Sequence, residues 1–225
     1  EKRGQYPFSN SKKGTDPFFH FFQAAQGEVH LVRRIAGYKK IRYYTHENIG
    51  FGKIDLPDQE MHTTAVWWQV NPDALEETFD SRQQALDGYL GAGYALHIVA
   101  AMRMLSEPRD IGRAVGDGNA EWFATVGSNG RGQMRNSEGE ALDPMNKQRF
   151  TPTLFLFDNF PCGIGISAPL LENRAAIVAD AHALVNDCVC AHGCPSCIGP
   201  ILASDEVRGF SPKQVALKVL GMLSS

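Results

Sequence analysis

The sequence predicts an α+β fold that carries a four-cysteine zinc knuckle near the C-terminus. Three observations lead to this prediction: strand patterning dominates residues 28–70, helical spacing takes over after Pro72, and four of the five cysteines fall within ten residues. A chain of 225 residues can bury a sizeable core without help from disulfides or a metal. Stability alone therefore does not explain the cysteines, which indicate a metal or redox site.

Residues 1–27 are predicted to be a tether and an aromatic docking segment. The first fifteen residues are mostly polar or turn-forming, and four phenylalanines lie between Phe18 and Phe22. We expect this cluster to dock on the domain or on a neighbouring one, because an exposed aromatic patch needs a covering surface. Residues 28–225 are predicted to form the zinc-binding domain.

The first part of this domain has the pattern of an antiparallel meander. Strands are expected over 28–32, 38–45, 52–56 and 62–70. The last of them is the best defined, because it is rich in β-branched and aromatic residues and stops at Asn71-Pro72.

Two helices are expected next. A short one covers about 72–79, and a long one runs from a cap at Ser81 to near Pro108. His97 lies among the regularly spaced apolar residues of the long helix, so we expect it to be hydrogen-bonded in the core. Residues 127–149 are dense in turn formers and short of core residues, which predicts a mobile loop.

A further strand–helix unit precedes the cysteines. Residues 153–157 form a continuous apolar run that ends in Asp158, a turn follows, and helical spacing extends from about 168 to 187. Ser211-Pro212 then starts a last helix of about eleven residues.

The cysteine cluster has the composition of a tetrahedral zinc site. Its members are Cys188, Cys190, Cys194 and Cys197, and the intervening Gly193 and Pro195 suit a sharp bend. Four thiolates repel one another unless a cation neutralises them, and zinc accepts four cysteine sulfurs at about 2.3 Å. Four such ligands leave no position for water or substrate, so we expect a structural Zn²⁺ site.

Three alternatives stay open at this point. An iron–sulfur cluster also takes four cysteines, although Cys-x-Cys-x₃-Cys-x₂-Cys is not the usual ferredoxin spacing. Cys194 and Cys197 could form a redox dithiol, but such motifs normally open a helix after a strand, whereas this one follows a helix. His192 could replace one cysteine as a ligand.

The fifth cysteine raises a thiol- or metal-dependent enzyme as a less favoured function. Cys162 lies between a predicted strand and a predicted helix, where a nucleophile would sit, and Asp158 precedes it by four residues. Nothing marks a histidine partner, and lone cysteines are usually small buried hydrophobes. Asp158 is expected instead to accept hydrogen bonds from backbone N–H groups of the following turn.

The residues that favour nucleic-acid contact lie between 29 and 46. Bases without an acid alternate there with tyrosines, and the candidate contacts are Arg33, Arg34, Lys39, Lys40, Arg42 and Tyr43. Basic side chains neutralise phosphates and aromatic faces stack on bases, so DNA, preferably single-stranded, is the expected partner. A charged sheet edge that prevents aggregation explains the pattern equally well.

Composition and missing motifs limit the other functions. The net charge of −3 excludes a protein that coats nucleic acid through bulk positive charge. The sequence has no Gly-x-x-x-x-Gly-Lys-Ser/Thr loop and no Gly-x-Ser-x-Gly elbow, so this chain alone is not expected to be an enzyme of the ATPase or serine hydrolase type. No apolar run reaches the ~20 residues of a membrane span and no secretory signal follows Glu1, which favours a cytoplasmic location without a membrane partner.

Two runs of residues resemble a known family. They are Leu154 to Gly165 (LFLFDNFPCGIG) and Cys188 to Pro200 (CVCAHGCPSCIGP), separated by a helix. Together they resemble the C-terminal cysteine-rich domain of bacterial DEAD/DEAH-box DNA helicases of the mitomycin-repair type, and Met61 to Trp68 (MHTTAVWW) extends the similarity upstream. The resemblance implies that the four cysteines bind zinc in an accessory domain. It also implies a superfamily-2 motor with 3′-to-5′ polarity that acts in DNA repair.

The chain departs from this family in two respects. The helicase motifs are absent, so the resemblance implies that ATP is hydrolysed by motor domains in the same or a partner chain. The family's turn usually has two glycines where this chain has Cys162-Gly163. A zinc-stabilised protein-interaction scaffold, in DNA repair or in phage defence, is the alternative function.

Overall fold

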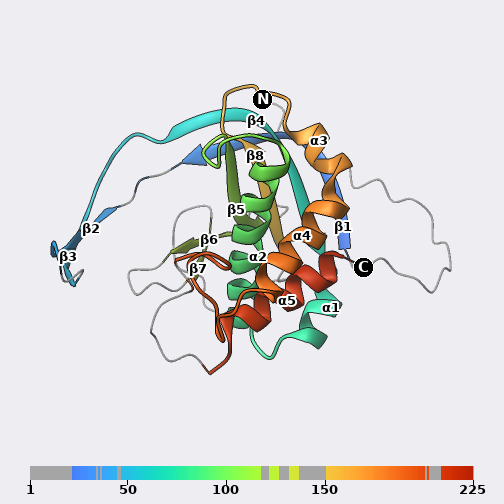
Figure 1. Ribbon diagram of the computed structural model, residues 1–225. Helices are drawn as coiled ribbons and strands as arrows, with labels where there is room; N and C mark the ends of the chain where they lie inside the picture. The colour runs from blue at the N-terminus through green and yellow to red at the C-terminus, as the bar shows by residue number, and fades with distance from the viewer. Residues whose placement is uncertain are drawn as a thin grey trace.

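The main element of the fold is a six-stranded antiparallel sheet with the strand order β1-β4-β8-β5-β6-β7 (Figure 1). The computed structural model describes residues 22–33, 35, 37–44, 47–117, 122–126, 132–136, 151–200, 202 and 209–224. The strands of this sheet are β1 (Phe22–Arg33), β4 (Gln59–Val70), β5 (Ile111–Asp117), β6 (Trp122–Val126), β7 (Gly132–Asn136) and β8 (Pro152–Asp158).

The expected meander is wrong, because β1 pairs directly with β4. Their register runs from Phe22 opposite Val70 to Arg33 opposite Gln59. The two strands between them in the chain, β2 (Gly37–Ile41) and β3 (Asn48–Lys53), form a separate two-stranded sheet. The predicted boundary between residues 27 and 28 falls inside β1, so residues 22–27 belong to the sheet.

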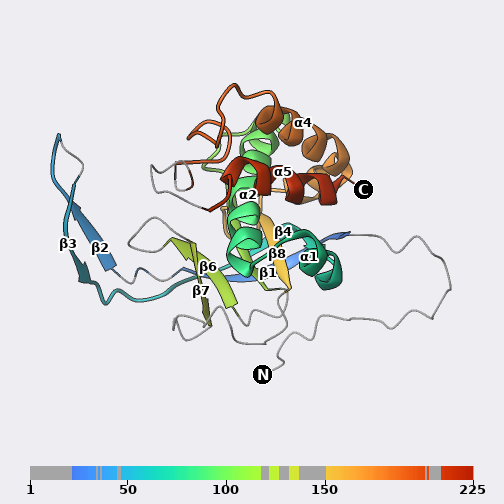
Figure 2. The ribbon, with the colours of Figure 1, turned by 90° about the horizontal axis from the view of Figure 1, so that it is seen from below.

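The β2–β3 hairpin projects away from the rest of the molecule. It extends beyond the ends of β1 and β4 in both Figure 1 and Figure 2, with no other labelled element beside it. A segment over residues 54–58 returns from the hairpin to β4, and its Leu56 is 49% exposed.

Helices α2, α4 and α5 pack together on one face of the sheet (Figure 2). The helices are α1 (Pro72–Thr78), α2 (Arg82–Arg103), α3 (Ser167–Glu172), α4 (Arg174–Asn186) and α5 (Pro212–Leu223). The predicted cap is confirmed, since the Ser81 side chain accepts a hydrogen bond from the N–H of Gln84. The helix expected over 168–187 is two helices, which meet at Asn173.

The core lies between the sheet and these helices. Alternate residues of β4 and β8 point into it, and the fully buried members include Val66, Trp68, Leu154 and Leu156. Helix α5 approaches α2 closely at Gly88, where an added Cβ would lie 2.8 Å from a backbone oxygen of α5. This close approach positions the start of α5 beside the cysteine loop.

His97 is a core residue, as expected. Its Nε2 lies 2.7 Å from the Pro108 carbonyl oxygen and 2.8 Å from that of Ile111, and its Nδ1 lies 3.1 Å from the Arg113 guanidinium. Because arginine can only donate, Nδ1 accepts and the proton belongs on Nε2, which donates to the carbonyls. The imidazole thereby joins α2 to β5.

Several sequence predictions fall wholly or partly outside the described residues. These are Arg34, Phe18 to Phe21 and most of the predicted loop 127–149. Within that loop, residues 132–136 form β7 and pair with β6, so this part is regular structure. Within the described ranges, no helix combines the length and the hydrophobicity that crossing a bilayer requires.

Candidate metal centre

The cysteine loop connects α4 to α5 and packs on α2. Cys197 and Ile198 are each 1% exposed and belong to the core. Gly91 of α2 lets this end of the loop and α5 approach the helix, since an added Cβ would lie 2.9 Å from the Ala216 Cβ and 3.2 Å from Leu202 Cδ1, next to Ile198. Gly199 lies against the ring of Tyr94 with a φ of +88°, a conformation that favours glycine. The loop is therefore anchored at its end by hydrophobic contacts with the long helix.

Four sulfur atoms converge in this loop. The Sγ atoms of Cys188, Cys190, Cys194 and Cys197 all lie within 4.8 Å of one another. Cys188 Sγ is 3.6 Å from Cys194 Sγ, and Cys197 Sγ is 3.6 Å from both Cys190 Sγ and Cys194 Sγ. A zinc ion with four sulfurs at about 2.3 Å defines a tetrahedron with edges of about 3.8 Å. The observed separations fit such an ion.

The backbone between the cysteines is shaped for this convergence. Gly193 has a φ of +115°, and an added Cβ would lie 2.1 Å from the Cδ1 atom of Ile198, so both conformation and space favour glycine there. A turn follows, in which the N–H groups of Cys197 and Ile198 donate to the Cys194 carbonyl oxygen, each at 3.1 Å. The predicted bend at this glycine is thus present.

The electrostatics of the loop differ from one thiol to the next. Burial raises the pKa of the Cys197 thiol to about 12. Burial also opposes ionisation of Cys194, but hydrogen bonds from the N–H groups of Cys197 and Ser196 outweigh it and lower the pKa to about 7. A thiolate at Cys197 needs a nearby cation, and a thiophilic metal ion supplies that charge directly.

Lys213 of α5 holds the cysteine loop through hydrogen bonds to its backbone, although it is not a member of the cysteine cluster. Its Nζ donates to the carbonyl oxygens of Cys188 at 2.6 Å and Cys190 at 3.1 Å, and lies 3.4 Å from that of Asn186. Its backbone N–H donates to the His192 carbonyl oxygen at 3.0 Å. The residue is only 7% exposed, so a buried ammonium lies against the backbone of Cys188 and Cys190.

The geometry discriminates among the ligand sets that the sequence leaves open. An iron–sulfur cluster places several metal and sulfide ions between its thiolates, whereas these sulfurs are close enough to surround a single ion. The Cys194–Cys197 pair lies in a turn after α4 and opens no helix, unlike a thioredoxin-type dithiol. His192 is exposed and is not one of the clustered residues. The donor set therefore fits Zn²⁺.

Residues 92–198 match the family model described as "MrfA Zn-binding domain". The matched range contains the whole cysteine cluster and most of α2. This segment is an MrfA-type zinc-binding domain. The cofactor expected from the sequence, a structural zinc, is confirmed by the agreement between this match and the sulfur geometry.

Two relatives of the MrfA-type domain extend the similarity over most of the chain. The chain is 30% identical over 187 residues to a Bacillus subtilis (strain 168) protein named "Uncharacterized ATP-dependent helicase YprA", which covers 83% of the chain. It also resembles the crystal structure of the helicase MrfA bound to DNA, with 26% identity, a TM-score of 0.56 and 91% of the chain covered. The chain spans only 20% of the first relative and 23% of the second.

Asp158 is engaged by the turn that follows β8, as expected. Its side chain is buried, and Oδ2 accepts hydrogen bonds from Thr64 Oγ1 at 2.9 Å and from the N–H groups of Ile164 at 3.0 Å and Gly165 at 3.2 Å. Gly163 in the same turn has a φ of +72°, and an added Cβ would come within 2.8 Å of both partners, Thr64 and Asp158. The carboxylate thus stabilises the turn through these hydrogen bonds.

Cys162 adopts a backbone conformation that favours glycine. Its φ is +64°, in the left-handed region that costs a non-glycine residue about 1–2 kcal/mol. Its N–H donates to the His62 carbonyl oxygen at 2.7 Å, and its side chain is exposed. The structure does not bring Cys162 to the cysteine cluster.

The candidate DNA contacts divide between two places. Arg33 ends β1, and its guanidinium donates to Asn159 Oδ1 at 3.2 Å beside the turn after β8. Lys39 and Lys40 lie on β2, and Arg42 and Tyr43 follow it at the hairpin turn. Arg42 pairs with Glu47 across this turn at 3.2 Å, which reduces the local excess of positive charge.

Sequence reasoning missed two features of these sites. Lys213 resembled an ordinary polar residue in the first turn of a helix, and no local signal marks its three carbonyl partners. Tyr38 is one of the tyrosines between residues 29 and 46, and the spacing of that region does not predict that its ring packs across Gly52 on the neighbouring strand. The alternation of glycines at Gly50 and Gly52 was the available signal, because glycine inside a strand often marks a close approach.

Proposed function

We propose that this chain is the C-terminal zinc-binding accessory domain of an ATP-dependent DNA helicase with 3′-to-5′ polarity that acts in DNA repair in the cytoplasm. The match of residues 92–198 to the MrfA Zn-binding domain carries the proposal. The similarity to a helicase sequence and to a DNA-bound helicase structure supports it. Motor domains in the same or a partner chain would hydrolyse ATP, and this domain would contact or guide the DNA.

The zinc ligands in this proposal are Cys188, Cys190, Cys194 and Cys197. Four thiolates complete the tetrahedron, so the metal would supply a rigid cross-link and no catalytic position. Bound there, it would hold the loop between α4 and α5 in one shape against α2.

Metal analysis of single variants tests the ligand set. The wild-type chain is expected to hold one zinc, Cys194→Ser to lose it, and Cys162→Ser to keep it, because Cys162 lies outside the cluster. Cys162→Ser is the matched control, since it also removes one thiol. A folded wild-type chain purified without any metal would contradict the proposal.

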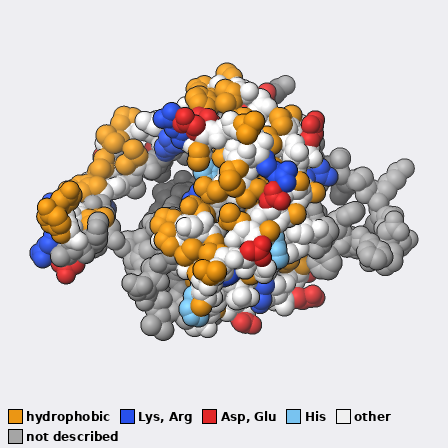
Figure 3. Space-filling model, in the orientation of Figure 1, with side chains coloured by type: hydrophobic (Ala, Val, Ile, Leu, Met, Phe, Trp, Pro, Cys, Tyr) orange, Lys and Arg blue, Asp and Glu red, His pale blue; other side chains and the backbone are white. Residues whose placement is uncertain are grey.

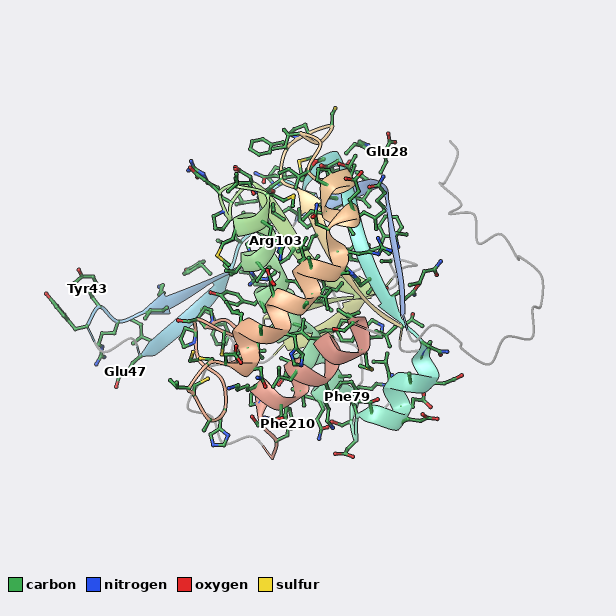
Figure 4. All side chains as sticks on the ribbon, turned by 45° about the vertical axis from the view of Figure 1, so that its right-hand side comes forward. Glu28, Tyr43, Glu47, Phe79, Arg103 and Phe210 are labelled. Atoms are coloured by element: carbon green, nitrogen blue, oxygen red, sulfur yellow. The ribbon has the colours of Figure 1, made fainter. Side chains whose placement is uncertain are left out.

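The DNA contacts in this proposal are Arg33, Arg34, Lys39, Lys40, Arg42 and Tyr43. Exposure of the hairpin supports them, since Lys40 and Arg42 are exposed and Tyr43 is 81% exposed. Figure 4 shows Tyr43 and Glu47 at the tip of the hairpin, far from the labelled residues of the helices. Such a placement supports access of a nucleic-acid backbone to Lys40 and Tyr43.

Fluorescence anisotropy with single-stranded and duplex DNA tests this part. We expect tighter binding of the single strand, and we expect a Lys39→Glu, Lys40→Glu double variant to bind at least tenfold more weakly at low salt. The slope of log K against log salt should also fall, by about 0.7 for each lost phosphate contact. Lys218→Glu, a change of the same kind on α5, should leave the affinity unaltered. Equal DNA affinities of all three proteins would show that the hairpin is not part of the DNA interface.

The second candidate function is a zinc-stabilised protein-interaction scaffold. The observation that favours it is the exposure of large hydrophobic side chains on the hairpin: Phe51 is 72% exposed, Ile49 56% and Ile41 54%. Figure 3 shows hydrophobic side chains over much of this projection. A chain that holds zinc but binds neither form of DNA would favour the scaffold.

A further inference from the structure

The two faces of the β2–β3 hairpin carry different residues. Residues paired across two strands share a face. Tyr38 pairs with Gly52 and Lys40 with Gly50, so these four residues occupy one face. Lys39 pairs with Phe51 on the other. One face therefore combines the Tyr38 ring and Lys40 with two glycines, while the other combines the exposed ring of Phe51 with Lys39.

The glycines let the Tyr38 ring lie on the backbone of the opposite strand. A Cβ added to Gly52 would come within 2.8 Å of three atoms of the tyrosine, Cε1, Cζ and the hydroxyl oxygen. The ring thus covers the position that a larger side chain would fill. Tyr38 nevertheless stays 45% exposed, so part of the ring faces solvent.

A lysine side chain places a positive charge close to the Tyr38 ring. Lys40 Nζ lies 5.8 Å from the centroid of the Tyr38 ring, on the face that both residues share. The acid in the sequence of the hairpin is Glu47, which pairs with Arg42 at the turn. The face therefore presents one aromatic surface and one adjacent positive charge.

An unpaired nucleotide has the complementary chemistry. Its base offers a flat π-face for stacking on tyrosine, and its phosphate offers a negative charge to lysine. In a duplex the bases are already stacked on one another, so the platform discriminates in favour of single strands. Tyr43 and Tyr44, 81% and 87% exposed at the turn, provide further aromatic surface along the same arm.

We propose that Tyr38, seated on Gly52, is a stacking platform for an unpaired nucleobase, with Lys40 contacting a neighbouring phosphate. This inference rests on the proposed function in DNA contact and adds the binding mode and the specificity for single strands. The opposite face, with Phe51, lies outside the site.

Oligonucleotides with and without bases test the platform. Anisotropy is measured with an oligothymidylate and with an abasic strand of equal length, which keeps the phosphates and lacks the stacking partner. The wild-type chain should bind the oligothymidylate about tenfold more tightly than the abasic strand. Tyr38→Leu should lose most of this preference and still bind both strands, whereas Tyr38→Phe should keep it.

Two further variants separate the platform from general effects on the hairpin. Gly52→Val should reproduce the loss seen in Tyr38→Leu, because the new side chain occupies the place of the ring. Phe51→Leu, on the opposite face, should keep the preference, because its side chain lies away from the Tyr38 ring. Lys40→Gln should weaken binding to both strands and lower the salt slope by about 0.7.

The outcomes distinguish the two proposals. A wild-type chain that binds neither strand would overturn the proposed DNA contact together with the platform. A wild-type chain that binds both strands equally, with Tyr38→Leu unchanged, would overturn the platform alone and leave the hairpin face to a protein partner.

Discussion

Lys213 joins the cysteine loop to α5 through one buried ammonium group. A zinc ion with four thiolates carries a net charge of about −2, and a positive charge beside it lowers the cost of burying that charge. The ammonium also donates to the Cys188 and Cys190 carbonyl oxygens, which fixes the two cysteines nearest to α4. The residue therefore stabilises both the charge and the shape of the site.

Replacing Lys213 tests this role. We expect Lys213→Met to weaken zinc retention about tenfold, the lower end for lost partners of metal ligands, as measured by competition with a chromogenic chelator. The free energy of unfolding should fall by about 2 kcal/mol, because buried carbonyl groups lose their donor. Lys218→Met on the same helix is the control, since the Lys218 Nζ donates to the Thr78 carbonyl oxygen far along α5 from the loop. Equal zinc retention in both variants would contradict the role.

Individual residues were predictable where their partners are local in sequence. The role of Asp158 followed from the turn directly after it, and two of its backbone donors lie six and seven residues downstream. The role of Lys213 did not, because its carbonyl partners lie 23 to 27 residues away and are reached only through the packing of α5 on α2. Sequence patterns indicate contacts between residues that are close in the chain, but not contacts that arise when distant elements pack together.

Among the elements, α2 and β5 are joined by His97. Burial lowers the pKa of this histidine below its ordinary value of 6.5, and the nearby Arg113 lowers it further, against the opposing effect of the two carbonyl acceptors. His97 therefore becomes protonated at a lower pH in the folded chain than in the unfolded chain, where its pKa is near 6.5. The stability that the neutral His97 imidazole contributes is fully present above pH 6.5 and is lost as the pH falls below that value.

Urea unfolding as a function of pH tests the histidine. From pH 7 to pH 5 the free energy of unfolding should fall more steeply in the wild-type chain than in His97→Gln, which has no proton to take up at this position. The variant should be less stable at pH 7, because it loses the hydrogen bonds between α2 and β5. Identical slopes in the two proteins would exclude His97 as the source.

Elements were predictable from local patterns more often than their pairing was. Ser81 and Pro72 marked helix starts correctly, because capping and proline geometry act within one turn. The pairing of β1 with β4 joins residues as far apart as Phe22 and Val70, with the hairpin between them, and alternation alone cannot specify a partner. The break at Asn173 was likewise missed, because the apolar spacing continues across it.

For the whole molecule, the metal centre was more predictable than the architecture around it. All four cysteines lie within ten residues, so their spacing alone brings the sulfurs together. The arrangement of β2 and β3 as a projecting hairpin depends on long-range pairing. The same pairing separates Arg33, at the end of β1, from Lys40 and Arg42 on the hairpin. The sequence places the candidate DNA contacts in one basic region, 29–46, and the structure distributes the described ones between the end of β1 and the hairpin.

The attachment of the hairpin has a mechanical consequence. Both of its connections leave the sheet at the same end, beside the pair formed by Arg33 and Gln59. A pull on the hairpin would therefore draw β1 and β4 along their axes together, without sliding one past the other. The resisting contacts include those of β4 with β8, which would be loaded in shear, so that their hydrogen bonds share the force. A load applied at the tip is thus transmitted into the centre of the sheet, against which α2 packs.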